Sequence, residues 1–125
     1  MKALVVDDEE KVRNMYKHLL RLESFDVFQA ENGEEASLML LQHSDIDLIL
    51  LDIRMPVIGG DAFFDLIKLH SPRAKVIVTS VYPLDDQRRV IDNADSYHDK
   101  AEGTEMLLSR IRRVLPRENK FKSSG

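Results

Sequence analysis

Five short apolar segments alternate with longer stretches in which apolar residues recur at helical spacing. The segments cover residues 3–6, 26–30, 47–51, 75–80 and, more weakly, 95–99. Short apolar runs without strict alternation predict strands that are buried on both faces. Strands that alternate with helices favour an α/β domain with a parallel sheet, because parallel strands need crossover connections.

The stretches between the strands predict five amphipathic helices. They lie at about residues 12–20, 34–42, 63–67, 84–91 and 107–115. On the first helix the predicted buried face consists of Val12, Met15, Tyr16, Leu19 and Leu20. The fourth stretch is short and polar, which makes it the weakest of the five. Pro116 should end the last helix near Leu115.

The length of 125 residues fits one compact domain. Cysteine is absent, which excludes a disulfide framework and a thiolate metal site. The apolar stretch before the acids at 7–10 is too short for a signal peptide or a membrane span, so we expect a soluble, cytoplasmic protein. The net charge of −4 is uneven, because residues 1–61 carry 6 basic and 13 acidic side chains. This asymmetry has two possible explanations. The charged residues lie on solvated faces, or the first half of the chain contains an acidic site.

The predicted strands end on residues that can form a site. Asp7 and Asp8 follow the first strand, Asp52 ends the third, Thr79 lies near the end of the fourth, and Lys100 follows the fifth. In a parallel sheet these carboxyl ends lie along one edge, where binding sites form beside a topological switch point. Three carboxylates repel one another, and a hard divalent cation such as Mg²⁺ relieves the repulsion.

Each of these residues also has a purely structural explanation. Asp7 with Glu10 fits a helix capping box, Thr79 is a β-branched strand residue, and Lys100 can be a solvated loop lysine. The joint pattern at four of five strand ends is what favours a site. Surface or structural positions are expected for the scattered histidines, His18, His43, His70 and His98.

Taken together, these residues resemble the receiver domain of two-component response regulators. The matching motifs are VVDD at 5–8, LLDIRMP at 50–56, Gly60, VTS at 78–80, and Tyr97 three residues before Lys100. The resemblance implies a doubly wound, flavodoxin-like (βα)5 fold. Its five-stranded parallel sheet would have the order 2-1-3-4-5, for which a receiver of this family is a standard example. The receiver domain would cover residues 1–117, with 118–125 as a polar tail or the start of a linker.

The resemblance also implies a phosphoacceptor and a metal site. Asp52 would take a phosphoryl group from a phosphohistidine on a partner protein. Mg²⁺ would be held by Asp8, by Asp52 and by the backbone carbonyl of Arg54, and Asp7 would reach the ion through water. The domain would thus be a signalling phosphoacceptor and not an enzyme acting on other molecules.

Further roles implied by the resemblance concern the switch. The Thr79 hydroxyl and the Lys100 ammonium would bind phosphoryl oxygens, and Pro56 and Gly60 would shape the loop after the acceptor. Movement of Thr79 would let the Tyr97 ring turn inward. The surface formed by the fourth helix, the fifth strand and the fifth helix would then change.

The expected partners follow from the same resemblance. They are a sensor histidine kinase or histidine phosphotransfer protein, and a downstream protein or output domain of unknown identity. A homodimer through the fourth helix, fifth strand and fifth helix is a candidate assembly. No nucleic-acid or membrane contact is expected within this chain.

Two other functions are compatible with parts of the pattern. A receiver-like binding module that works without phosphorylation would explain the unusual fifth strand. A Mg²⁺-dependent phosphohydrolase with an aspartyl nucleophile would commonly need a second acid at the position of Arg54.

One departure from the family concerns the residue after Lys100. The family usually has a cis proline there, whereas this chain has Ala101. A cis bond before a non-proline residue costs about 2.5–4 kcal/mol. We therefore expect a trans bond with a rearranged loop, or a strained cis bond held by its surroundings. A trans bond could displace Lys100 from the site.

Overall fold

The computed structural model describes residues 1–53, 60–82, 84–91 and 93–115, apart from the side chains of residues 61 and 88–90. Its strands are β1 (Lys2–Val6), β2 (Asp26–Ala30), β3 (Leu48–Asp52), β4 (Lys75–Ser80) and β5 (Ser96–Asp99). Its helices are α1 (Glu10–Leu22), α2 (Gly33–Gln42), α3 (Gly60–His70), α4 (Leu84–Val90), the short 3-10 helix η1 (Lys100–Glu102) and α5 (Thr104–Val114). Strands and helices alternate, as the apolar pattern predicts.

All strands of the sheet run parallel, in the order β2-β1-β3-β4-β5. This confirms the predicted doubly wound, flavodoxin-like topology. The chain moves from β1 to β2 on one side and then crosses to β3 on the other side of β1. The carboxyl ends of β1 and β3 therefore form the topological switch point, where ligands bind in folds of this kind.

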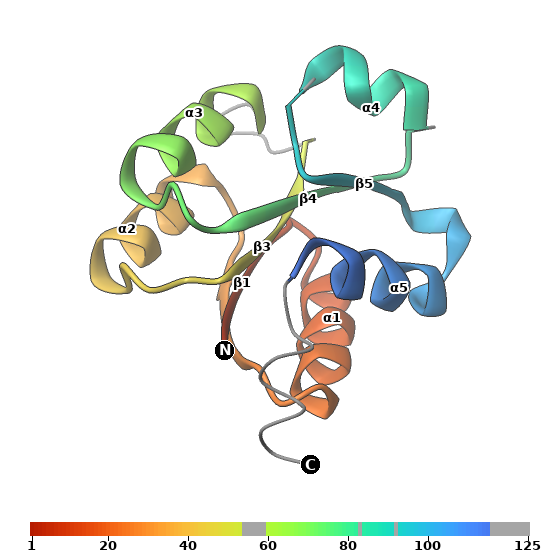
Figure 1. Ribbon diagram of the computed structural model, residues 1–125, viewed down its shortest axis with the longest axis horizontal. Coiled ribbons are helices and arrows are strands. Elements are labelled where there is room, and N and C mark those ends of the chain that lie inside the picture. The colour runs from red at the N-terminus through yellow and green to blue at the C-terminus, as the bar shows by residue number, and fades with distance from the viewer. Residues whose placement is uncertain (54–59, 83, 92, 116–125) are drawn as a thin grey trace.

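Residues of each central strand alternate between two cores on opposite faces of the sheet. Leu4 and Val6 of β1 belong to the core that α2 and α3 cover, whereas Ala3 and Val5 belong to the core that α1 and α5 cover. Figure 1 shows α1 and α5 together on one side of the sheet and α2 and α3 on the other. Each fully buried aliphatic side chain contributes about 1.5–3 kcal/mol, so β1 and β3 anchor the residues that follow them.

The helix boundaries agree with the predictions, including the weak fourth helix and the end of α5 before residue 116. The predicted face of α1 is correct for Tyr16 and Leu20, which are buried. It is wrong for Met15, which is 47% exposed. Successive helical residues lie about 100° apart, so Met15 stands at the edge of a contact stripe centred on Tyr16 and Leu20.

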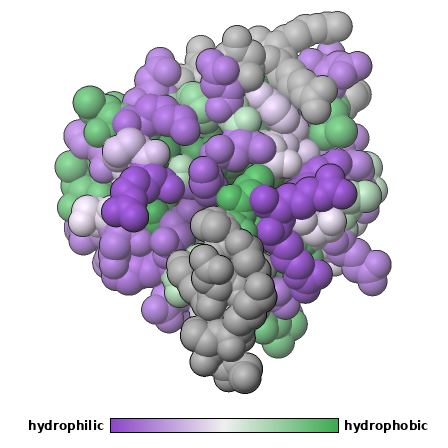
Figure 2. All heavy atoms as spheres, viewed as in Figure 1, coloured by the Kyte–Doolittle hydropathy of each residue, from purple (hydrophilic) through white to green (hydrophobic). Residues whose placement is uncertain are grey.

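The face of the molecule in Figure 2 is mainly polar, with small separate apolar areas near its edges and near its middle. In the described parts of the chain, none of the helices is both long and apolar enough to cross a membrane.

The connection from β5 to α5 has a trans backbone, which is the first of the two forms that the sequence left open. Cis peptide bonds are absent among the described residues, so the Lys100–Ala101 bond is trans. Lys100 opens the 3-10 helix η1 directly after β5. Gly103 then joins η1 to α5 with φ 87° and ψ 169°, a backbone region that is essentially restricted to glycine.

Replacing Gly103 with alanine should therefore destabilise the fold through backbone strain alone. An added Cβ would meet no atom within 4 Å, so steric overlap does not contribute. We expect Gly103→Ala to lower the free energy of unfolding by about 1–3 kcal/mol, measured by urea denaturation. Ser24→Gly is the matched control, because Ser24 has φ 70° and should gain stability from glycine. Equal stability of Gly103→Ala and the wild type would contradict the strain at this position.

Candidate functional site

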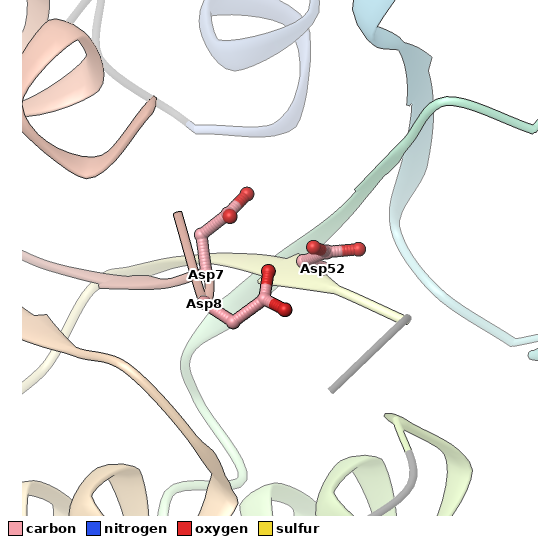
Figure 3. A group of neighbouring side chains, drawn as sticks. All are labelled: Asp7, Asp8 and Asp52. Carbon is pink, nitrogen blue, oxygen red and sulfur yellow. The ribbon is translucent and has the colours of Figure 1, made fainter. Parts of the chain in front are cut away.

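Three carboxylates meet at the carboxyl edge of the sheet. Asp7 and Asp8 follow β1, and Asp52 is the last residue of the neighbouring strand β3. One oxygen of each lies within 4.8 Å of the others. Asp7 and Asp52 are buried, Asp8 is exposed, and Figure 3 shows the Asp8 carboxylate pointing toward Asp52. The structure thus brings together the three acids that the sequence placed at two strand ends.

The ammonium of Lys100 closes this cluster from β5. Its Nζ donates to Asp7 Oδ2 at 2.7 Å and to Asp52 Oδ2 at 3.4 Å. Burial alone would lower the pKa of Lys100, but the hydrogen bond to Asp7 and the charge of Asp52 raise it above its ordinary value. Lys100 is therefore fully protonated at neutral pH and offsets part of the negative charge.

The displacement of Lys100 that a trans bond could cause is not observed. The residues on either side are fixed by a capping box at the start of η1. The Asp99 carboxylate accepts a hydrogen bond from the Ala101 amide at 2.9 Å, and the Glu102 carboxylate accepts one from the Asp99 amide at 3.1 Å. These bonds turn the chain into η1 at once, which keeps the Lys100 side chain directed at the acids.

The hydroxyl of Thr79 lies beside the cluster without a protein partner. Thr79 pairs in register with Asp52 across β3 and β4. It is 1% exposed, and its Oγ1 has no hydrogen-bond partner among the described residues. The neighbouring Ser80 differs, because its Oγ accepts a hydrogen bond from the Tyr82 amide at 3.1 Å. An unsatisfied buried hydroxyl costs free energy, and an oxygen-rich ligand at Asp52 would give it a partner.

Backbone contacts fix the position of Asp7. Its Oδ1 accepts a hydrogen bond from the Glu9 amide at 2.9 Å. The capping box predicted for Asp7 with Glu10 is wrong, because the N-cap of α1 is Glu9 and has no side-chain cap bond. Arg13 of α1 donates to the Asp7 carbonyl at 2.8 Å, a contact that sequence reasoning missed. Periodicity marked only the apolar side of α1 and gave no signal for this polar contact.

Another residue that sequence reasoning did not connect with the site is Tyr16 of α1. It was predicted only as part of the apolar face. Burial, with the charges of Asp7 and Asp52, raises the pKa of its phenol. The phenol is thus neutral and adds no charge beside the acids.

Tyr97 of β5 is packed in the interior. It is 9% exposed, its hydroxyl donates to the Ile91 carbonyl at 2.6 Å, and the Ala94 amide donates to that hydroxyl at 3.3 Å. The ring therefore occupies the inward position. Two predicted site residues, Arg54 and Pro56, lie outside the described residues.

The other predicted loop residue, Gly60, is the first residue of α3. The histidines are structural or on the surface, as predicted. His18 and His70 are exposed, His43 stacks on Phe28, and His98 is 1% exposed inside β5.

The donor set at this edge suits a hard divalent cation. Carboxylate oxygens are the ligands that Mg²⁺ prefers, and the ion commonly takes one or two carboxylates together with waters. Asp8 and Asp52 offer such oxygens, one of them from an exposed side chain that water can reach. Cysteine thiolates, which favour softer metals, are absent from the chain. The residues present therefore fit Mg²⁺.

A separate cavity of about 410 Å³ lies at the opposite edge of the sheet. Met1, Asp47 and Lys75 in its wall adjoin the amino ends of β1, β3 and β4. It contains none of the residues of the acid cluster. Chemistry, and not the volume of a cavity, therefore identifies the site.

Comparison with known proteins agrees with the fold and the site. The sequence pattern of the family described as response regulator receiver domain matches residues 3–112. The chain is 36% identical over 119 residues to the transcriptional regulatory protein CpxR of Escherichia coli strain K12, covering 94% of this chain and 50% of that protein. It is 31% identical over 125 residues to a probable transcriptional regulator, ycf27, of Porphyridium aerugineum, covering 99% and 52%. The chain thus spans about half the length of these curated relatives.

Solved structures give the same result. The response regulator TrrA of Thermotoga maritima, crystallised in complex with Mg²⁺-BeF, superposes with a TM-score of 0.79 at 33% identity, covering 91% of this chain and 98% of that one. The chemotaxis protein CheY4 of Vibrio cholerae superposes with a TM-score of 0.82 at 27% identity, with the same coverage. The fold and the acid cluster define a receiver. The chain belongs to the family of response regulator receiver domains of two-component systems, whose members are signalling domains.

The unpartnered hydroxyl of Thr79 should reduce stability. Thr79→Val keeps the side-chain shape and removes the unsatisfied group, so we expect the free energy of unfolding to rise by about 1 kcal/mol. Ser80→Ala is the matched control, because it removes the bond to Tyr82 and should lower that free energy by about 0.5–1.5 kcal/mol. Urea denaturation of the three proteins measures both. A loss of stability in Thr79→Val would show that the hydroxyl has a stabilising partner.

Proposed function

We propose that this chain is a phosphoacceptor domain in which Asp52 receives a phosphoryl group from a partner phosphohistidine. The observation that carries the proposal is the convergence of Lys100 with Asp7, Asp8 and Asp52 at the switch point. Negative charge held beside a fixed ammonium suits a reaction that depends on positioning and charge stabilisation.

The proposed reaction uses residues from three strand ends. An oxygen of Asp52 attacks phosphorus, the phosphorus–nitrogen bond of the phosphohistidine breaks, and the imidazole nitrogen keeps the bonding electrons. Before the reaction the Lys100 ammonium donates hydrogen bonds to two carboxylates. After the reaction it donates one of its hydrogen bonds to a phosphoryl oxygen instead. The Thr79 hydroxyl donates to another oxygen and so gains its missing partner. Mg²⁺, when bound, supplies further positive charge against the phosphoryl oxygens.

The proposed metal ligands are Asp8, Asp52 and the backbone carbonyl of Arg54, with Asp7 acting through water. The geometry of Asp7 supports its outer role. One of its oxygens already accepts a hydrogen bond from the Glu9 amide, and the other accepts one from the Lys100 ammonium. Asp8 is the exposed member of the cluster, which leaves it free to approach an ion from solvent.

The proposed switch connects Thr79 to the surface of α4, β5 and α5. The Tyr97 ring already lies inward in this structure. Movement of Thr79 toward a phosphoryl group would therefore increase the population of that inward state and would not create it. Gln87 supports this link, because its amide donates to the carbonyls of Tyr82 and His98 and so ties α4 to both the β4–α4 loop and β5. A partner that binds the two states with different affinity would read the change.

The proposed partners are a histidine kinase or phosphotransfer protein and a downstream protein or output domain. We propose residues 1–117 as the receiver and 118–125 as a tail or the start of a linker. Because the matched relatives are named as transcriptional regulators, transcriptional output is the first activity to test. A homodimer through α4, β5 and α5 is the assembly to test with it.

Phosphorylation of Asp52 can be tested directly by intact mass. We expect incubation with acetyl phosphate and Mg²⁺ to add one phosphoryl group to the wild type and none to Asp52→Asn. Asp47→Asn is the matched control, since Asp47 precedes β3 at the opposite edge of the sheet, and should be phosphorylated as the wild type is.

The same experiment separates the alternatives. An unmodified wild type that is folded and binds Mg²⁺ would refute the proposal and favour a binding module that works without phosphorylation. Release of phosphate from many free phosphoesters per protein molecule would indicate a phosphohydrolase instead.

Mg²⁺ should raise thermal stability, because it binds the folded acid cluster and not the unfolded chain. At ten times the dissociation constant the gain is about 1.4 kcal/mol, or a few degrees in Tm. We expect Asp8→Asn to lose most of this shift, and Asp26→Asn, an exposed change in β2, to keep it. Differential scanning calorimetry with and without Mg²⁺ measures the shift. An equal shift in Asp8→Asn would remove Asp8 from the proposed metal site.

A further inference from the structure

A second polar network lies behind Lys100, between β5, η1 and α5. Arg110 of α5 forms two hydrogen bonds with the Glu102 carboxylate, from Nη1 to Oε1 at 2.7 Å and from Nη2 to Oε2 at 3.2 Å. The same Nη1 lies 2.9 Å from Nδ1 of His98. The network therefore joins the middle of α5 to the strand that ends next to Lys100.

The arginine contact defines the state of His98. Arginine can only donate, so Nδ1 of His98 accepts and the ring is neutral, with its proton on Nε2. Burial and the charge of Arg110 lower the pKa of His98, against smaller opposing effects of Glu102 and Asp99. A neutral ring at pH 7 lets Arg110 bond to His98 and Glu102 at the same time.

Glu102 also acts on the backbone beside Lys100. Its Oε1 accepts a hydrogen bond from the Asp99 amide, and the Asp99 carboxylate accepts one from the Ala101 amide. These two bonds hold the residue before Lys100 and the residue after it. Glu102 is an exposed residue and the Arg110 side chain is 16% exposed. The role of the pair therefore lies in the two hydrogen bonds that fix the position of the Glu102 carboxylate, because the charge attraction of an exposed ion pair contributes little.

We propose that Glu102 is a positioning residue for Lys100. Arg110 fixes the Glu102 carboxylate, and Glu102 in turn keeps the Lys100 ammonium in contact with Asp7 and Asp52. Alanine at position 101 does not restrict the backbone as a proline ring would. The Glu102–Arg110 pair restrains the backbone around Lys100 instead. The inference rests on the proposed function of Asp52, because the consequence of positioning Lys100 is faster phosphorylation. It also makes α5 part of the mechanism, since any partner that engages Arg110 would change how firmly Lys100 is held.

Glu102→Ala tests this role, with Glu105→Ala as the matched control. Both changes remove one exposed glutamate near the start of α5, but only Glu102 contacts Arg110 and the Asp99 amide. We expect Glu102→Ala to slow phosphorylation of Asp52 by about tenfold or more at saturating Mg²⁺, and Glu105→Ala to leave the rate unchanged. Glu102→Gln keeps an acceptor for the Asp99 amide and should recover part of the rate.

A second measurement does not depend on phosphorylation. Crystal structures of the unphosphorylated proteins should show Lys100 Nζ displaced from the carboxylates of Asp7 and Asp52 in Glu102→Ala, and unmoved in Glu105→Ala. Circular dichroism confirms that each variant is folded. If Glu102→Ala does not fold, Arg110→Gln, which breaks the same ion pair, takes its place in both measurements.

The two readouts separate the inference from the proposed function. If the wild type is phosphorylated on Asp52, an equal rate and an unmoved Lys100 Nζ in Glu102→Ala would overturn the positioning role and leave the function standing. A wild type that is not phosphorylated would refute the function, and the position of Lys100 Nζ in the crystal structures would then decide the positioning role. Slower phosphorylation of Glu102→Ala with Lys100 Nζ unmoved would also count against it.

Discussion

The contact of the Lys100 ammonium with Asp7 and Asp52 is the interaction on which the site depends. Two buried carboxylates at neighbouring strand ends repel each other, and the lysine from β5 places a positive charge between them. Loss of one partner from a buried charge pair costs about 3–5 kcal/mol. The contact also connects the segments that follow β1 and β5 with the last residue of β3. The same contact therefore neutralises charge in the site and holds this edge of the sheet together.

The connection from β5 to α5 shows how this contact survives without a proline after the lysine. A capping box between Asp99 and Glu102 turns the chain into a 3-10 helix, and Arg110 restrains Glu102 from the neighbouring helix. Hydrogen bonds therefore replace the covalent restriction of a proline ring. Such bonds can be broken by a partner or by substitution, whereas a proline ring cannot. In the proposal above, α5 is therefore connected to Lys100 indirectly, through Glu102.

Two features of the site lower the stability of the fold. The Thr79 hydroxyl is buried without a partner in the described part of the chain, and three acids lie together at one edge. Both features are unfavourable in the structure as it stands, and the proposed binding of a cation and a phosphoryl group would offset them. The apolar strands β1 and β3, which are almost fully buried, provide the stability that tolerates them.

The sequence alone determined the five strands, the five helices and the acids at the strand ends, because apolar periodicity is a local property of the chain. Resemblance to a family added the strand order, which periodicity does not contain. Only the tertiary structure decided that Lys100 reaches Asp7 despite Ala101, and that Arg13 holds the Asp7 backbone. It also decided that His98 is buried against Arg110. These contacts join residues on separate elements, so their geometry exists only once the helices have packed on the sheet.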